Sequence, residues 1–309
     1  MMPHLAVVIV SWNVRDLLGA CLRSLFVDLD RSNLEAQVWV VDNASTDGTP
    51  DMVAESFPEV RLIAGRENLG FAAGNNVALT AISQGTEHAA RSTQYVWLLN
   101  PDTEVRPGAT AALLSALHAH PHAGVAGAKL LYADGSLQHS AFRFPGLVQL
   151  AFELFPLPSR FYDTPLNGRY PRRLYQAQPP FLVDHPLGAA MMVRTEAVAQ
   201  VGLMDEGYHM YCEEIDWCWR MRRTGWRALC VPAAGVIHHA GRSTAQVPIP
   251  SFINLWTSRA RLYRRHHGPL TWRTAQALVR AGMRRRMRGA SPDMVAACRQ
   301  VIQAWEEIR

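Results

Sequence analysis

Lysine, cysteine and long apolar runs are scarce in this chain of 309 residues, which suits one large domain or two small ones. Lys129 is the single lysine among 31 basic residues. The five cysteines are odd in number and follow no Cys-x-x-Cys spacing, which argues against a disulfide framework or zinc site and favours a reducing compartment. No apolar run reaches 18 residues, so we expect no membrane-spanning helix. The start, Met1 to His4, lacks the features of a signal peptide, and we predict a cytoplasmic location.

Charged residues are also sparse, and their distribution along the chain is uneven. They make up 18% of the sequence against 49% hydrophobic residues, which fits a packed core and excludes intrinsic disorder. Residues 259–309 hold 12 Arg and three acidic residues, a net charge of +9, whereas the first 258 residues have 19 basic and 23 acidic residues. A uniformly basic coat is therefore excluded, and we expect no nucleic-acid partner.

Strand and helix patterns alternate over the first 130 residues. Continuous apolar runs predict buried strands over residues 5–10, 37–41, 60–63 and 95–99. Helical spacing of apolar residues predicts helices over residues 16–26, 49–56 and 74–83. This alternation indicates an α/β fold with a mainly parallel sheet covered by helices. Ligands bind beyond the carboxyl ends of such strands, where Asn13, Asp42 and Asp102 all fall.

In the second half of the chain the pattern changes. Seven prolines interrupt residues 142–180, and we predict a long, variable loop there. A strand over 188–193 and a helix over 212–223 are expected next. Two basic amphipathic helices are expected to follow, over residues 254–266 and 271–288.

Four polar motifs occur in a fixed order along the chain. They are VVDNASTDG at 40–48, NLGFAAGNN at 68–76, LNPD at 99–102 and CEEIDWC at 212–218. Together they closely resemble the motifs of inverting family-2 glycosyltransferases, and within that family the rhamnosyltransferase-like branch, which adds a sugar to cell-wall or polysaccharide acceptors. The resemblance covers about residues 5–267 and implies a GT-A fold. It implies a nucleotide-sugar half at about 1–130 and an acceptor half at about 131–267, followed by a basic amphipathic helical tail at 268–309.

The resemblance implies a nucleotide-sugar site at the ends of the first strands. The Asp42 carboxylate is expected to accept hydrogen bonds from a base N–H or a ribose hydroxyl of the pyrimidine nucleotide, and its neighbour Asn43 is a further expected contact. The other expected contacts to the nucleotide sugar are Ser11, Trp12, Asn13, Asn68, Gly70, Gly74, Asn76 and Asn100. Taken singly, an Asp here is also a candidate helix N-cap, and the glycine segment a candidate turn. We interpret Asp47 as a cap.

A divalent metal, Mg²⁺ or Mn²⁺, is the expected cofactor. Asp102 would hold it, and the metal would neutralise the leaving diphosphate as a Lewis acid. The family pattern is Asp-x-Asp, and Asn100 replaces the first carboxylate, which predicts a weaker site completed by the diphosphate and water. His238, in a segment that resembles the family's His-x-x-Gly-x-Ser element, is the second expected ligand. The adjacent His239 and a purely structural role for the imidazole are the alternatives.

Three acidic residues lie at the start of the helix predicted over 212–223. The family's acid pair matches Glu213 and Glu214, which implies that Glu214 is the general base for the acceptor hydroxyl. At the ordinary pKa of about 4.3, such a Glu is ionised at neutral pH. Glu213 and Asp216 are expected to orient the acceptor and to share a helix face with Arg220. The alternative is that these acids cap the helix and pair with nearby arginines.

The resulting expectation is a metal-dependent, inverting, non-processive glycosyltransferase. Its donor would be a nucleoside-diphosphate sugar, first dTDP-L-rhamnose, and its acceptor a glycan or polyprenyl-linked precursor. The Gln-x-x-Arg-Trp element of processive synthases is absent from the sequence. Two alternatives stay open: a nucleotidyltransferase that makes sugar nucleotides, and a catalytically silent, nucleotide-sugar-binding subunit of a membrane polysaccharide assembly complex.

The arginine-rich tail raises the question of a membrane partner. A helix with an arginine-rich polar face can lie on an anionic bilayer, each charge contributing on the order of 1 kcal/mol. That would make the protein peripheral on the inner face of the plasma membrane. The alternative is a solvated helix that packs on the catalytic domain.

Overall fold

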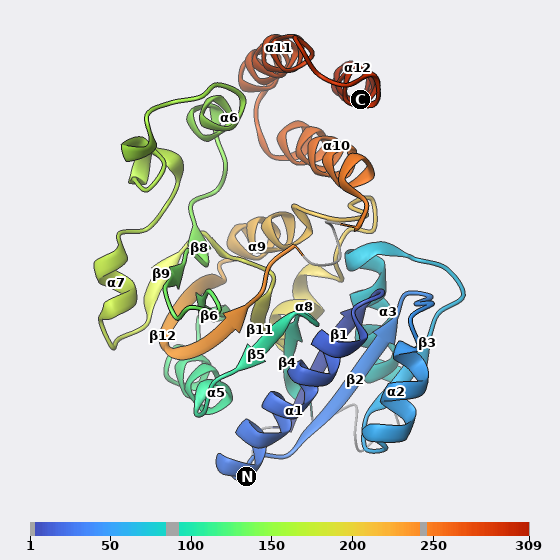
Figure 1. Cartoon of the computed structure of the whole chain (residues 1–309). Coiled ribbons are helices and arrows are strands. Elements are labelled where there is room, and N and C mark those ends of the chain that lie inside the picture. The colour runs from blue at the N-terminus through green and yellow to red at the C-terminus, as the bar shows by residue number, and fades with distance from the viewer. Residues whose placement is uncertain (1–3, 85–92, 242–245, 309) are drawn as a thin grey trace.

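A computed structural model gives the fold of the chain and describes residues 4–84, 93–241 and 246–308 (Figure 1). Its main sheet contains four parallel strands from the first hundred residues, in the order β3-β2-β1-β4. They are β1 (His4–Ser11), β2 (Ala36–Asp42), β3 (Arg61–Ala64) and β4 (Thr93–Leu99). The predicted α/β fold with a mainly parallel sheet is confirmed.

The sheet continues beyond β4 with strands from the second part of the chain. The order there is β11-β6-β12-β5, and β11 runs antiparallel to both β4 and β6. Their bounds are β5 (Thr103–Val105), β6 (Ala123–Leu131), β11 (Ala190–Arg194) and β12 (Arg227–His238). The shorter strands are β7 (Leu137–Gln138), β8 (Ala141–Phe142), β9 (Phe181–Val183) and β10 (His185–Pro186). One sheet therefore joins the two halves of the molecule.

Helices cover both faces of the sheet, which explains the continuous apolar run in β1. Leu5, Val7 and Ile9 face a core formed with α1 (Arg15–Arg31), α2 (Thr49–Ser56) and α5 (Ala109–Ala119). The alternate β1 residues face a second core formed with α3 (Gly70–Gln84), α8 (Thr195–Val201) and α9 (Glu213–Arg223). Successive side chains of a strand point to opposite faces, so both sets are buried. Burial of each large side chain contributes about 1.5–3 kcal/mol.

The strand order reverses direction at β1, and this topology prepares a binding site. The chain passes from β1 to β2 on one side, while β4 lies on the other. Ser11 and Asp42 are in register at the ends of β1 and β2, and Asn100 follows β4. Ligands of open α/β sheets bind at such a switch point, beyond the carboxyl ends of the strands.

A third core lies among helices from the end of the chain and one from the middle. It joins α6 (Leu147–Leu154) with α10 (Pro248–His266), α11 (Pro269–Arg286) and α12 (Pro292–Glu307) at the top of Figure 1. Trp272 stacks on Trp305 at 5.2 Å, and the Trp305 indole donates to the carbonyl of Trp256. Val279 and Met283 of α11 are buried in this core. The apolar face of the basic helix is thus occupied by other helices.

The loop predicted over 142–180 contains helices, so that prediction is wrong in part. Besides α6, this segment forms α7 (Arg172–Gln176) and two short 3-10 helices, Ser159–Phe161 and Pro165–Asn167. Leu154 of α6 packs where Gly282 of α11 leaves room for it. The prolines that suggested a loop separate these short helices. In the described part of the chain, no helix combines the length and hydropathy needed to cross a bilayer.

Candidate active site

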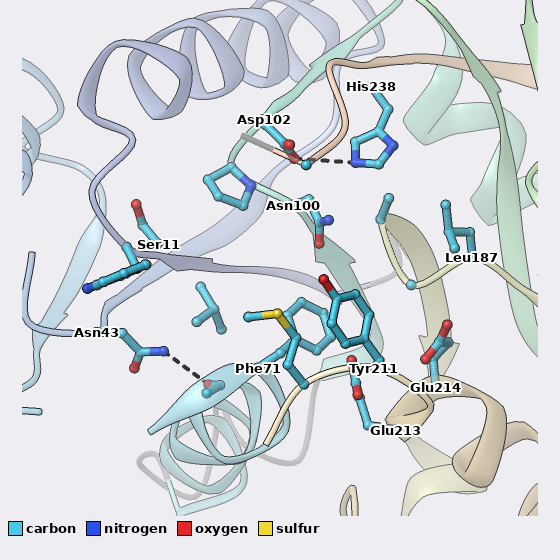
Figure 2. Close-up of a pocket in the computed structure, with 18 of the residues that line it drawn as sticks. Ser11, Asn43, Phe71, Asn100, Asp102, Leu187, Tyr211, Glu213, Glu214 and His238 are labelled. Atoms are coloured by element: carbon cyan, nitrogen blue, oxygen red, sulfur yellow. Dashed lines mark hydrogen bonds and ion pairs between the residues drawn. The ribbon is translucent and has the colours of Figure 1, made fainter. Parts of the chain in front are cut away.

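A cavity of about 340 Å³ opens at the carboxyl ends of the strands and is lined by residues from both halves of the chain (Figure 2). Most of the predicted site residues line it. They are Ser11, Trp12, Asn43, Asn68, Gly70, Asn100, Asp102, Glu213, Glu214 and His238. Phe71, which lies within the motif at 68–76, adds an apolar wall together with Leu187, Met210 and Tyr211, which lie outside the four motifs.

Several polar atoms that face this cavity have no partner among the described residues. They are the Ser11 hydroxyl, the Asn43 Oδ1 and the Asn100 Oδ1, each buried. The Asn43 Nδ2 is engaged, because it donates to the carbonyl of Gly70 at 3.0 Å. Buried polar groups in native proteins are almost always hydrogen-bonded, so these atoms indicate a place for a polar ligand or water.

Gly70, in the cavity wall, has a left-handed backbone conformation and lies against the backbone of His209. Its φ is +82°, and an added Cβ would overlap the carbonyl oxygen of His209. That oxygen also accepts from the Phe71 N–H at 2.8 Å, and the Gly70 N–H donates to Asn68 Oδ1 at 2.9 Å. Glycine is needed here because it permits both the positive φ and the close approach of the His209 backbone.

Asp42 and Asn13 lie beside the cavity without lining it. The Asp42 Oδ2 accepts from the Ser45 N–H at 2.8 Å, while its Oδ1 is buried without a partner in the described chain. The Asn13 Oδ1 accepts from the Thr46 N–H at 2.8 Å. Both side chains therefore shape the turn after β2. The expectation that Asp47 caps the helix is wrong in position, because the N-cap of α2 is Gly48; Asp47 instead accepts from the Thr49 N–H at 3.1 Å, in an Asx turn just before the helix.

Gly74 and Asn76 are directed away from the cavity, so the structure does not bring them to the expected nucleotide-sugar site. Gly74 packs against Val10, and a Cβ there would approach the Val10 Cγ1 to 2.8 Å. The Asn76 amide donates to the Met204 carbonyl and to Glu206, each at 2.9 Å. Gly74 allows α3 to pack closely against β1, and Asn76 joins α3 to the segment that precedes α9.

Asp102 and His238 are neighbours at one end of the cavity, as predicted. The Asp102 Oδ1 and the His238 Nε2 lie 3.4 Å apart (Figure 2), because β5 pairs with the end of β12. The His238 Nδ1 lies 3.1 Å from Gln138 Oε1, which only accepts, so we assign the proton to Nδ1. The lone pair of Nε2 is then free for a ligand. His239 instead contacts Glu104 at 2.7 Å.

These two side chains suit a divalent cation. A carboxylate and an imidazole are ligands for Mn²⁺ or Mg²⁺, and the unpartnered Asn100 Oδ1 is a further oxygen donor in the same cavity. Within the described ranges, no three His, Cys, Asp or Glu side chains gather around one point, so other ligands would come from diphosphate and water. Arg242 and Ser243 of the predicted His-x-x-Gly-x-Ser element lie outside the described residues.

Glu213 and Glu214 begin α9 on another side of the cavity. Tyr211 and Cys212 precede them with φ of 70° and 69°, a left-handed turn made by two residues with side chains. Burial raises the pKa of Glu214 to about 7, and burial together with the Glu214 charge raises that of Glu213 well above its ordinary value. The expectation of an ordinary pKa is therefore wrong. A carboxyl that titrates near neutrality suits a general base.

Asp216 lies outside the cavity, which corrects the expectation that it orients an acceptor. Its buried carboxylate contacts Arg220 at 2.8 Å and His266 at 2.7 Å, and Trp219 stacks on His266 at 4.5 Å. Burial opposes ionisation, but the hydrogen bonds from His266 and Arg220 lower the pKa of Asp216. The predicted pairing with Arg220 is thus present, and it ties α9 to α10.

The family model described as Glycosyl transferase family 2 matches residues 6–202. An N-acetylglucosaminyl-diphospho-decaprenol L-rhamnosyltransferase of Mycobacterium tuberculosis is 32% identical over 79% of this chain and 78% of its own length.

Solved structures share the fold. The mannosyltransferase PcManGT of Pyrobaculum calidifontis, in complex with GDP-Man and Mn²⁺, has a TM-score of 0.57 and 18% identity over 99% of this chain and 86% of its own. GalNAc-T7, with UDP, GalNAc and Mn²⁺, also has a TM-score of 0.57, with 16% identity over 76% of this chain and 43% of its own. At these identities the likeness establishes the fold alone.

Proposed function

Because this chain belongs to glycosyl transferase family 2 and is therefore a transferase enzyme, we propose that it moves one sugar from a nucleoside-diphosphate sugar to a hydroxyl group with inversion. The donor we propose first is dTDP-L-rhamnose. The acceptor we propose is a glycan or polyprenyl-linked precursor of a cell-wall or other polysaccharide. The rhamnosyl group and the polyprenyl-linked acceptor are those named for the mycobacterial relative, which is 32% identical to this chain, whereas the dTDP carrier is implied only by the resemblance to the rhamnosyltransferase-like branch.

One observation carries the proposed reaction: the cation-suited residues and the acid pair occupy different sides of one cavity. Figure 2 shows Asp102 and His238 close together and Glu213 and Glu214 at another part of the same cavity, with Tyr211 beside Glu213. In an inverting transfer the acceptor oxygen attacks the anomeric carbon from the face opposite the leaving diphosphate. A sugar between the two groups would present its leaving group to one and its attacked face to the other.

The proposed step needs a proton acceptor, which Glu214 supplies. The acceptor oxygen forms a bond to the anomeric carbon while the bond from that carbon to the diphosphate oxygen breaks. The Glu214 carboxylate takes the hydroxyl proton, and its pKa of about 7 leaves it ionised often enough and basic enough to do so near neutral pH. When a divalent cation is bound by Asp102 and His238, it supplies positive charge for the departing diphosphate.

The apolar wall of the cavity supports a deoxy sugar as the donor's glycosyl group. Phe71, Leu187 and Tyr211 line the cavity together with the acid pair. The methyl group of a 6-deoxyhexose can bury apolar surface there, whereas the hydroxyl of an ordinary hexose would lose hydrogen bonds to water. This difference supports testing rhamnose before glucose or mannose.

We also propose that the basic tail attracts the protein to an anionic membrane surface that carries the acceptor. Exposed arginines of α11 include Arg273, Arg284 and Arg285, while the apolar face of that helix is buried. Attraction would therefore be electrostatic, without insertion of an apolar face, and should weaken steeply with salt. Sedimentation with anionic liposomes at low salt tests this, and a protein that stays in solution would refute it.

The main test is ligand-induced stabilisation followed by transfer. Purified protein would be heated with UDP-, GDP-, dTDP- and CMP-sugars, each with and without Mn²⁺ or Mg²⁺. A ligand at a hundred times its Kd stabilises the native state by about 2.7 kcal/mol. We expect metal-dependent stabilisation by dTDP-rhamnose and transfer to a lipid-linked N-acetylglucosamine acceptor. Binding of a nucleotide sugar without transfer to any acceptor would favour the alternative of a catalytically silent subunit. In that case the Glu214→Gln variant would bind the nucleotide sugar as the wild type does.

A further inference from the structure

Two carboxyl groups meet in the cavity, and the proposed mechanism uses only one of them. Glu213 is 5% exposed and Glu214 is 8% exposed, and each has an Oε2 without a hydrogen-bond partner among the described residues. Side chains of consecutive helical residues ordinarily point about 100° apart. Here both line the cavity, because the left-handed turn at Tyr211 and Cys212 starts the helix at its wall.

No described cation neutralises this pair. Arg259 of α10, whose charge acts on the neighbouring Cys212, forms its ion pair with Glu153 of α6. Arg220 of α9 forms its ion pair with Asp216 and donates hydrogen bonds to the carbonyls of Val201 and Leu203. In the described ranges, neither Glu213 nor Glu214 takes part in an ion pair.

Among the residues that the structure describes, no Arg or Lys side chain forms an ion pair with either member of the pair. Burial raises the pKa of the Cys212 thiol in the preceding turn well above its ordinary value, so this group is uncharged at neutral pH. Across the cavity, Asp102 and His238 contact each other at 3.4 Å. Two adjacent carboxylates in such surroundings cannot both be ionised at low cost.

From this geometry we propose that Glu213 and Glu214 share one proton, which resides on Glu213 in the active enzyme. Glu213 then donates a hydrogen bond to a hydroxyl of a sugar in the cavity, while ionised Glu214 accepts the proton of the attacking hydroxyl. This inference rests on the proposed function. No proton leaves Glu213 during the reaction, and the proton taken by Glu214 passes to water after product release.

The start of α9 decides which partner keeps the proton. The backbone N–H groups of Glu214 and Ile215 lower the pKa of Glu214 against the effect of burial. For Glu213, burial and the neighbouring Glu214 charge both raise the pKa, and only its own N–H opposes them. The negative charge is thus more stable on Glu214, nearer to the helix N–H groups.

The test compares Glu213→Gln with Glu214→Gln in the full-length protein. Glutamine keeps the size and a hydrogen-bond donor but cannot ionise. Wild-type turnover of dTDP-rhamnose should follow a bell-shaped pH profile, with an acid limb from Glu214 and an alkaline limb from Glu213 losing its proton. Glu213→Gln should lower turnover by less than about tenfold and abolish the alkaline limb, whereas Glu214→Gln should lower it by about a hundredfold or more at every pH.

A second readout does not depend on activity. Infrared difference spectra between wild type and Glu213→Gln at pH 7.5 should contain the C=O band of one protonated carboxyl group. Absence of that band, or a Glu213→Gln enzyme that keeps its alkaline limb or is as inactive as Glu214→Gln, would overturn the inference. If the wild type transfers no sugar at all, the proposed function fails instead, and the infrared result still decides whether Glu213 holds a proton.

Discussion

Replacing Glu214 by glutamine is expected to stabilise the protein while it removes transfer activity. In the folded state burial raises the pKa of this carboxyl to about 7, from 4.5 without the protein environment. The folded state therefore binds a proton more tightly than the unfolded state between these values. Since unfolding then releases a proton, the free energy of unfolding of the wild type falls as the pH rises from about 4.5 to about 7.

The size of the effect follows from this difference in pKa. At 1.36 kcal/mol per pKa unit, it amounts to about 3 kcal/mol in total, of which about 2.5 kcal/mol falls between pH 5 and pH 8. Glutamine does not ionise, so Glu214→Gln lacks this loss. Between pH 5 and pH 8, the free energy of unfolding of the variant should therefore rise by about 2.5 kcal/mol relative to that of the wild type.

Urea unfolding at pH 5, 6, 7 and 8 measures this gain, and the transfer assay measures the loss of activity in the same preparations. Glu55→Gln is the matched control, because Glu55 is exposed on α2 and does not line the cavity. Its free energy of unfolding should follow that of the wild type at every pH. If Glu214→Gln also parallels the wild type, burial does not raise the pKa of Glu214, and the argument for a base poised near neutrality collapses.

Three further substitutions test the metal site and the ion pair that ties α9 to α10. Asp102→Asn should lower transfer by about a hundredfold or more and remove the metal-dependent part of the thermal shift with dTDP; an undiminished shift would mean that the metal binds elsewhere. Gln138→Leu removes the acceptor for the His238 Nδ1–H. It should weaken Mn²⁺ binding by about 10- to 100-fold in a calorimetric titration with dTDP present, and unchanged affinity would contradict the assigned orientation. Asp216→Asn leaves Arg220 without its buried partner and should cost about 3–5 kcal/mol in urea unfolding; a cost below about 1 kcal/mol would show that the pair is not structural.

Local patterns in the sequence were sufficient for the central part of the fold. The strand β1 is readable because a strand covered on both faces needs an unbroken apolar run, and α2 was predicted with the bounds that the structure has. The C-terminal helical core was harder to foresee. The eight residues of α6 lie between prolines, and their apolar face is explained only by α11, more than a hundred residues later.

The functional site, like the fold, could be predicted from the sequence only in part. Residue type and motif order, with the family resemblance, pointed to Asp102, His238 and the Glu213–Glu214 pair, because such chemistry needs carboxylates and an imidazole at strand ends and at a helix start. They could not separate Glu213 from Asp216, since the direction of each side chain depends on the turn before α9.

Only the tertiary structure decided how these groups behave. Gln138 became a neighbour of His238 through the pairing of β7 with β6, beside β12, which has no counterpart in local sequence. The acid pair owes its raised pKa values to burial, and Asp216 owes its lowered pKa to His266 and Arg220. A sequence determines which groups are present, but protonation depends on desolvation and on charges brought close by folding.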